Sequence, residues 1–184
     1  MTAVTTTDHS TDIAASDLTG KASSQYLTFK LAGEEFGLDI LRVQEIRPWT
    51  PVTRMPAAPA HVEGVLNLRG TVVPIIDLRT RLAIPRAEYD STTVIIVLHL
   101  EHADRRRMAG LVVDAVSDVT KVREAEHKPV PDFGMAADAR FVRAMAALEE
   151  RMVMLLDVDH LVDPEDLAEL AEMTVPEVTK AAAG

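Results

Sequence analysis

The chain has 184 residues, of which 47% are hydrophobic and 26% are charged, a composition typical of a folded globular protein. The formal net charge of -10 and the aromatic content of 4% argue against nucleic acid and anionic lipid as partners, because both are polyanions and base stacking needs aromatic rings. The sequence contains no cysteine, which excludes disulfide bonds and thiolate chemistry.

Residues 1–24 are rich in Thr, Ser, Asp and Ala and follow no helical or strand period, which predicts a disordered N-terminal tail. This segment has no basic start followed by an apolar stretch, so it does not resemble a secretory signal. The longest apolar run, Val94 to Leu98, is far shorter than the roughly 20 residues of a membrane-spanning helix. We therefore expect a cytoplasmic protein without direct membrane insertion.

Short strands dominate the pattern from Gln25 onward. Tyr26 to Leu31 predicts a strand, Ala32 to Glu35 a hairpin turn, and Phe36 to Ile40 the returning strand. Leu41 to Ile46 fits either a strand or a short helical turn. A loop follows, because proline fixes φ and removes a backbone donor, and prolines recur at Pro48, Pro51, Pro56 and Pro59.

A second hairpin is predicted where two apolar runs flank Arg69-Gly70, since glycine at position 70 can adopt the positive φ of a tight turn. Its strands are Val62 to Leu68 and Thr71 to Ile76. Leu78 to Leu82 then predicts one helical turn before Pro85. Further strands are predicted at Thr92 to Leu100, Met108 to Val113, Val116 to Val122, Phe141 to Leu148 and Arg151 to Asp157, with connections at Glu101 to Arg107 and Glu149-Glu150.

The end of the chain changes to a helical period. Asp163-Pro164-Glu165-Asp166 offers an N-cap, a proline at the first helical position and early acidic residues, which predicts a short C-terminal helix within residues 163–184. Many short strands punctuated by Gly and Pro favour small barrels over an α/β sheet. The break at Ile84 to Asp90 divides them into two subdomains, about 25–84 and 85–150, although no convincing sequence repeat relates the two.

Catalytic and metal-binding patterns are weak. His99 and His102 are three residues apart, but that spacing does not bring two ligands together in a strand and turn, and the HExxH, CxxC and EF-hand patterns are absent. Arg105-Arg106-Arg107 fits a nucleic-acid patch less well than a solvated hairpin tip. Asp157 and Asp159 fit a helix cap better than a catalytic acid pair. Asp77 follows a strand as a phosphoacceptor would, but the other receiver residues are missing. We predict no catalytic residue, no metal and no cofactor.

Six sequence blocks, in order and with matching spacing, resemble the CheW family over Tyr26 to Val162. They are Val43 to Arg47, Thr53 to Pro59, Gly64 to Gly70, Val73 to Arg79, Gly110 to Val119 and Leu155 to Leu161. Two departures occur, where Phe141 is followed by Val142-Arg143-Ala144 and Arg47 by Pro48-Trp49, at positions where the family commonly has glycine. Both departures affect the expected geometry of a loop.

The resemblance implies a mostly β fold of two intertwined five-stranded SH3-like β-barrels plus a short C-terminal helix. The CheW-like domain would span 25–162, with terminal segments crossing over between the subdomains. It also implies a non-catalytic adaptor in bacterial chemotaxis that couples methyl-accepting chemotaxis receptors to the CheA histidine kinase at arrays on the inner face of the membrane. Self-association within arrays is left open.

The resemblance implies that the receptor signalling tip is a helical hairpin, so the site that binds it needs an apolar trough with polar anchors. Leu66 is a candidate for the trough, with barrel core as the alternative for each apolar member. Gly64 would let a foreign backbone approach closely or simply form a turn. Glu45 and Arg69 are expected to form an ion pair, and leaving either partner alone in a partly buried site would cost about 1–3 kcal/mol. The predicted receptor-binding residues are Val43, Glu45, Ile46, Gly64, Asn67, Leu68 and Arg69.

The kinase-binding residues stay unknown at this point. Val94-Ile95-Ile96 and Met152-Val153-Met154 fit either a β-surface for the kinase or buried core. Two alternatives to the adaptor are a CheW paralogue that serves another array, for example one for surface motility, and a small ligand-binding or enzymatic β-barrel. The enzyme alternative requires a polar cleft with shifted pKa values, which the sequence does not nominate.

Overall fold

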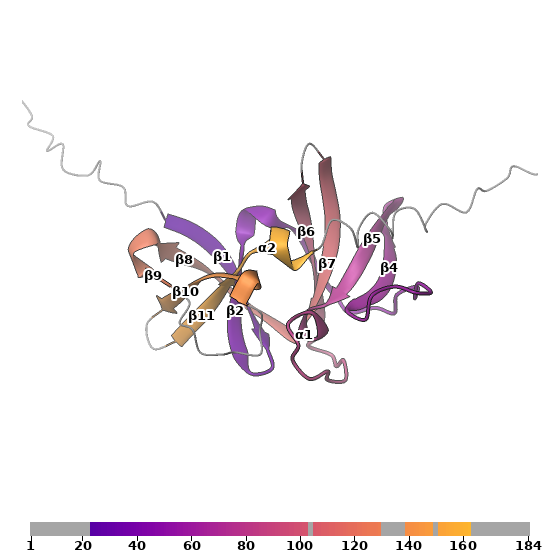
Figure 1. The fold of residues 1–184 in the computed structure, drawn as a ribbon, viewed down its shortest axis with the longest axis horizontal. Coiled ribbons are helices and arrows are strands. Elements are labelled where there is room, and N and C mark those ends of the chain that lie inside the picture. The colour runs from indigo at the N-terminus through magenta and orange to yellow at the C-terminus, as the bar shows by residue number, and fades with distance from the viewer. Residues whose placement is uncertain (1–22, 103–104, 130–138, 149–150, 163–184) are drawn as a thin grey trace, which may run out of the picture.

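The computed structural model describes residues 23–102, 105–129, 139–148 and 151–162, which form two β-sheets connected by short helices (Figure 1). Sheet A has the strand order β8-β1-β2-β11-β10-β9, and sheet B has the order β3-β6-β7-β5-β4. The strands of sheet A are β1 (Ser23–Leu31), β2 (Glu34–Asp39), β8 (Ala115–Arg123), β9 (His127–Lys128), β10 (Val142–Leu148) and β11 (Arg151–Leu156). The strands of sheet B are β3 (Val43–Pro48), β4 (Val62–Leu68), β5 (Thr71–Asp77), β6 (Val94–His102) and β7 (Arg105–Val113). The short helices are η1 (Ile40–Arg42), α1 (Leu78–Arg81), η2 (Glu124–Glu126), η3 (Ala139–Phe141) and α2 (Val158–Leu161).

The mostly β, two-sheet SH3-like fold is confirmed, with sheet A holding six strands rather than five. Hydrogen bonds between strands close neither sheet into a complete barrel within the described residues, although an isolated bridge between Thr53 and Val65 extends sheet B. The predicted C-terminal helix in 163–184 and the predicted turn Glu149-Glu150 lie outside the described residues, as do residues 1–22 of the predicted tail.

Three predicted boundaries differ from the structure. β1 begins at Ser23 rather than after residue 24, because Ser23 and Ser24 pair with the end of β8. The predicted connection Glu101 to Arg107 is wrong for most of its length. β6 continues to His102 and β7 starts at Arg105, since the backbone ladder extends through charged residues as readily as through apolar ones. The ambiguous segment 41–46 contains both alternatives, with η1 followed by β3.

The two departures from the family pattern lie at strand ends, where Pro48 ends β3 and Val142 begins β10. The Trp49 backbone N–H donates to the Thr93 carbonyl at 3.0 Å, and the Trp49 ring packs on Tyr89 with centroids 4.3 Å apart. Phe141 is buried, and its carbonyl accepts a hydrogen bond from the Asp157 backbone N–H at 2.9 Å. Packing and backbone hydrogen bonds therefore hold both segments without the expected glycines.

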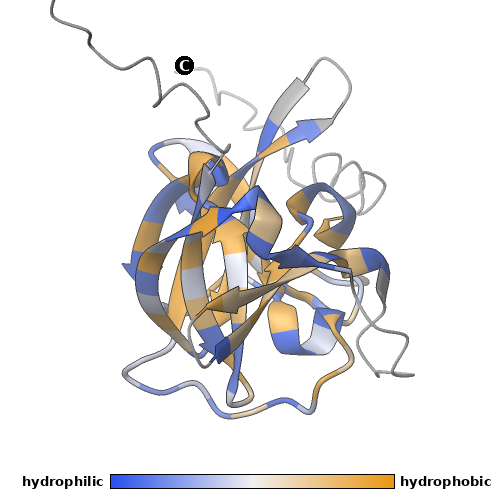
Figure 2. Ribbon diagram, turned by 90° about the vertical axis from the view of Figure 1, so that its left-hand side faces the viewer, coloured by the Kyte–Doolittle hydropathy of each residue, from blue (hydrophilic) through white to orange (hydrophobic). Residues whose placement is uncertain are grey.

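The central strands bury both faces, so that the protein has three hydrophobic clusters rather than one. Along β6, Ile96 and Leu98 point into a cluster shared by the two sheets, whereas Ile95 and Val97 point into a cluster private to sheet B. This is the alternation expected of a strand, and it explains why the sequence of β6 is a continuous apolar run. In Figure 2, hydrophobic and hydrophilic segments alternate along several outer strands. Both α1 and α2 contribute side chains to the shared cluster.

The two sheets repeat one topology that the sequence did not reveal. Each contains, in order, two antiparallel pairs, one parallel pair and another antiparallel pair: β8-β1-β2-β11-β10 in sheet A and β3-β6-β7-β5-β4 in sheet B. The first half of the chain supplies β1–β5 and the second half supplies β6–β11. The halves exchange strands, because β1 and β2 join β8–β11 in sheet A, whereas β6 and β7 join β3–β5 in sheet B. The sheets therefore change at residues 40–42 and at Asp114, not at the predicted break 84–90, which connects β5 to β6 within sheet B.

Two ion pairs fix the segments that pass between the sheets. Arg42, in the passage from β2 to β3, pairs with Asp159 of α2 at 2.8 Å. Asp114, in the passage from β7 to β8, accepts a hydrogen bond from Arg79 of α1 at 2.8 Å. The two pairs occupy related places with the charges reversed. Because β3 starts directly after Arg42, the first pair also anchors the beginning of the strand that carries the candidate site.

Candidate functional site

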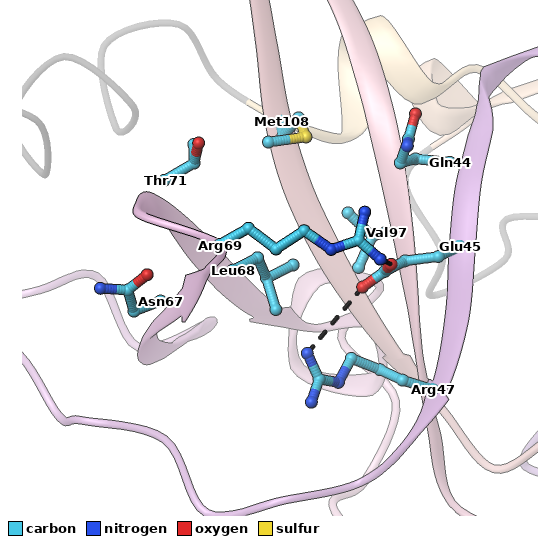
Figure 3. A pocket seen from close by; sticks show the side chains of 9 residues that line it. All are labelled: Gln44, Glu45, Arg47, Asn67, Leu68, Arg69, Thr71, Val97 and Met108. Carbon is cyan, nitrogen blue, oxygen red and sulfur yellow. Dashed lines mark ion pairs between the residues drawn. The ribbon is translucent and has the colours of Figure 1, made fainter.

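A cavity of about 460 Å³ lies between the edge strand β3 and the β4–β5 hairpin, with β6 and β7 behind it (Figure 3). We call it the first cavity. Its lining combines charged, amide and apolar side chains, and consists of Gln44, Glu45, Arg47, Asn67, Leu68, Arg69, Thr71, Val97 and Met108. It includes four of the predicted receptor-binding residues, namely Glu45, Asn67, Leu68 and Arg69.

The hairpin that borders the first cavity is held by its turn residues. Arg69 and Gly70 both have positive φ, 50° and 89°, as a two-residue type I′ turn requires. The Asn67 side-chain oxygen accepts a hydrogen bond from the Gly70 backbone N–H at 2.8 Å. The prediction of positive φ at Gly70 is confirmed, and the side-chain oxygen of Asn67 helps to shape the turn.

Glu45 lies between two guanidinium groups. Its carboxylate is 3.6 Å from Arg69 Nη2 and 3.9 Å from Arg47 Nη1 (Figure 3). The Arg69 side chain is 86% exposed, whereas that of Glu45 is 31% exposed. Since solvent screens such a pair, its contribution to stability is about 0–1 kcal/mol rather than the expected 1–3 kcal/mol. The Nε atom of Arg47 is buried and has no hydrogen-bond partner among the described residues.

The predicted apolar trough is only partly present. Val43 packs against the shared cluster and Leu66 against the sheet B cluster, so core packing explains both. Ile46 is 43% exposed and Val72 is 40% exposed. Sequence reasoning missed Val72, Val97 and Met108 because their positions follow from the register of strands distant in sequence.

Gly64 has a different role from the one predicted. A Cβ atom at this position would clash with the Thr53 carbonyl oxygen, and would lie 2.8 Å from the Thr53 carbonyl carbon. The glycine is buried and has a φ of 151°. The backbone that approaches Gly64 closely therefore belongs to this chain, and it prevents a receptor backbone from using the same space.

The apolar runs considered for the kinase are mostly interior. Ile95 and Ile96 are fully buried, and Val153 and Met154 are also buried. Met152, in contrast, is 47% exposed. Core packing thus explains these runs except at Met152 and the half-buried Val94.

The carboxylates considered for chemistry have structural partners. Asp157 caps α2 by accepting a hydrogen bond from the Asp159 backbone N–H at 3.1 Å, which confirms the cap. Asp77 is buried and accepts hydrogen bonds from the Thr80 backbone N–H at 2.8 Å and from the Tyr89 hydroxyl at 2.6 Å. Burial, and then the hydrogen bond to Asp77, raises the pKa of Tyr89. Such a buried, fully engaged carboxylate is not accessible to a phosphoryl donor.

Within the described ranges, no group of three or more His, Cys, Asp or Glu side chains could hold a metal ion. His99 hydrogen-bonds to Gln44 beside the first cavity, while the side chain of His102 lies outside what the structure describes. The described helices include none that is long and apolar enough to span a membrane.

A two-sheet β protein that presents a mixed charged and apolar cavity beside an edge strand has the form of an interaction module. The CheW-like domain model matches residues 25–166, and the chain belongs to this family. It is 42% identical over 154 residues to chemotaxis protein CheW of Klebsiella aerogenes, covering 83% of this chain and 90% of that protein. Chemotaxis protein CheW of Rhizobium meliloti is 40% identical over 153 residues, covering 83% and 96%. The crystal structure of the scaffolding protein TtCheW from Thermoanaerobacter tengcongensis matches with a TM-score of 0.69 at 31% identity, covering 77% of this chain and 89% of that one.

Proposed function

We propose that this chain is a non-catalytic adaptor that couples methyl-accepting chemotaxis receptors to a CheA-like histidine kinase. It would act in the cytoplasm, at receptor arrays on the inner face of the membrane. Membership of the CheW-like family supports this role, as do relatives that are named chemotaxis proteins and a structural relative that is described as a scaffold.

The first cavity is our candidate for the receptor contact. The observation that carries this assignment is the Glu45 carboxylate held between Arg47 and Arg69 at the mouth of an apolar-floored cavity. A helix docked there would place an apolar ridge on Leu68 and Met108, which line the cavity.

Binding measurements test the adaptor role directly. The full chain is titrated with a receptor signalling-tip fragment and with the kinase, and the mixture is analysed for a ternary complex. We expect the three components to assemble without chemical turnover by this chain. Failure to bind either protein would contradict the proposal, and a preference for the kinase and receptor of another array would identify a paralogue.

Replacing Arg69 by alanine is expected to weaken receptor binding roughly tenfold, which corresponds to about 1.4 kcal/mol. The free energy of unfolding should change by less than about 0.5 kcal/mol, because the side chain is 86% exposed. Isothermal titration calorimetry and urea unfolding measure the two quantities. Arg143→Ala, an exposed arginine on β10 in sheet A, is the control and should affect neither. Unchanged receptor affinity in Arg69→Ala would show that the cavity mouth is not the contact.

A further inference from the structure

Sheet A contains a cavity of about 430 Å³ between its edge strand β8 and the residues where β10 ends and β11 begins. We call it the second cavity. Because β8 corresponds to β3 and the strands β10–β11 correspond to β4–β5 in the repeated topology, the second cavity occupies the same place in sheet A as the first does in sheet B. It is lined by Asp118, Val119, Thr120, Lys121, Glu126, Ala147, Leu148 and Arg151.

Strand registers support this equivalence residue by residue. In the parallel pairs, Leu155 is opposite Gly37 in sheet A and Ile75 is opposite Gly110 in sheet B. Each glycine makes room for the side chain opposite it, since an added Cβ would lie 2.9 Å from Leu155 Cδ2 or 2.6 Å from Ile75 Cδ1. The two halves of the chain therefore share a packing solution that goes beyond strand order.

The irregularities of the ladders coincide as well. β4 shifts register between Val62 and Gly64, opposite Ile76 and Ile75, and β10 shifts between Val142 and Ala144, opposite Leu156 and Leu155. β-Bulges are specific features of a sheet rather than incidental defects. Their recurrence indicates that positions on the two hairpins can be compared directly.

This comparison pairs the linings of the two cavities. The spacing from Gly37 to Ile46 equals that from Gly110 to Val119, so that Glu45 corresponds to Asp118. Five positions line both cavities, and the corresponding residues are Glu45 and Asp118, Arg47 and Thr120, Asn67 and Ala147, Leu68 and Leu148, and Thr71 and Arg151. The acid on the edge strand and the leucine at the hairpin end are thus retained.

Exposed apolar side chains also occupy equivalent positions in the two sheets. Ile46 and Val119 correspond and are both 43% exposed, and Val72 and Met152 correspond with 40% and 47% exposed. Burying such side chains favours association, and large exposed apolar groups beside a cavity are typical of contact surfaces. The two sheets thus expose apolar side chains at corresponding positions, and Leu148 of the second cavity corresponds to Leu68, which we assign to receptor binding in the first.

The charges of the second cavity restrict what it can bind. Arg151 is neutralised by Glu35 at 2.9 Å, and Glu126 by Arg123 at 2.6 Å. Among the described residues, Asp118 and Lys121 form no ion pair. One acid and one base are thereby left beside Val119 and Leu148, which complements a helix whose apolar residues are flanked by side chains of both signs.

We propose that the second cavity is a second docking site for a receptor-type α-helical hairpin, so that one chain holds two hairpins. This inference rests on the proposed function of the first cavity. The loss of the cation at the position of Arg47, where Thr120 stands, makes the second site the weaker of the two for the same hairpin. An adaptor with two such sites links neighbouring receptors without needing another copy of itself.

The stoichiometry of receptor binding tests the inference. The full chain is titrated with the receptor signalling-tip fragment to saturation, and the mass of the complex is measured by sedimentation equilibrium. We expect two hairpins per wild-type chain, with the second bound at least tenfold more weakly. Val119→Glu and, separately, the surface variant Lys121→Glu should reduce the stoichiometry to one and leave the tighter affinity unchanged.

Other outcomes separate the two proposals. A stoichiometry of one for the wild-type chain, or of two for both variants, would overturn the second site while leaving the first intact. Loss of kinase binding in Val119→Glu with a wild-type stoichiometry of one would also overturn it, because the surface would then belong to the kinase. If the wild-type chain bound no hairpin at all, the proposed function itself would fail.

Discussion

Replacing Asp77 by alanine is expected to lower the free energy of unfolding by about 2–4 kcal/mol. The side chain is 2% exposed and serves three partners. It caps α1 through the Thr80 backbone N–H at 2.8 Å, accepts the Tyr89 hydroxyl at 2.6 Å, and lies 3.6 Å from Arg86. Loss of the cap contributes about 1 kcal/mol, and the half-buried tyrosine hydroxyl left without its acceptor, together with the lost Arg86 contact, contributes the remainder.

The corresponding residue in the other half of the chain provides a matched control. Asp157 caps α2 in the same way, but its side chain is 31% exposed and no tyrosine donates to it among the described residues. Asp157→Ala should therefore cost only about 1 kcal/mol. Urea unfolding of both variants measures the difference. Equal effects would show that the Tyr89 and Arg86 contacts contribute little.

Alkaline pH offers a second measurement on the same pair. Burial and the hydrogen bond to Asp77 raise the pKa of Tyr89 above its ordinary value of 10.0. A raised pKa in the folded state stabilises the protein below about pH 10 and loses this contribution as the unfolded tyrosine ionises at higher pH. The decline in stability above pH 10 should be smaller in Asp77→Ala, because the hydrogen bond and the negative charge of Asp77, which both raise the pKa of Tyr89, are removed while burial remains.

Local sequence patterns predicted most strands and the β character of both halves of the chain, because turn and strand preferences depend on residues that are close in sequence. The Arg69-Gly70 turn follows from the freedom of glycine at positive φ, and the run in β6 follows from burial on both faces. The same patterns did not predict that the chain passes from sheet A to sheet B between residues 39 and 43. Nothing local distinguishes a β2 that pairs with β11 from one that continues into the sheet of β3, because parallel pairing such as Leu155 with Gly37 depends on a partner more than a hundred residues away.

The candidate site was predictable to a similar extent. Glu45 and Arg69 were brought together as expected, since the family resemblance already related β3 to the hairpin. The high exposure of the Arg69 side chain was not predictable, because it depends on whether residues distant in sequence pack over the hairpin tip. The sequence does not show the repeated topology, for a related reason. Few residue types are shared by the two halves, and what they share is the register of bulges and the places of Gly37 and Gly110, which only pairing reveals.

Replacing Gly64 by alanine is expected to lower the free energy of unfolding by about 3–5 kcal/mol. The φ of 151° is strained for any residue with a Cβ atom, which costs about 1–3 kcal/mol. The added methyl group would also overlap the Thr53 carbonyl, so the backbone must move. That movement would disrupt the two hydrogen bonds between Thr53 and Val65, at 3.0 and 2.8 Å, which tie the proline-rich loop to β4.

Gly70→Ala separates backbone strain from steric overlap. Gly70 also has positive φ, 89°, but no atom lies within 4 Å of the place its Cβ would take. It should therefore lose only the strain component, about 1–2 kcal/mol. Hydrogen exchange supplies the local readout. The Thr53 and Val65 amides should lose protection in Gly64→Ala and keep it in Gly70→Ala. If both variants were destabilised equally and the Thr53 amide stayed protected, the close approach of Thr53 to Gly64 would not be what requires glycine at this position.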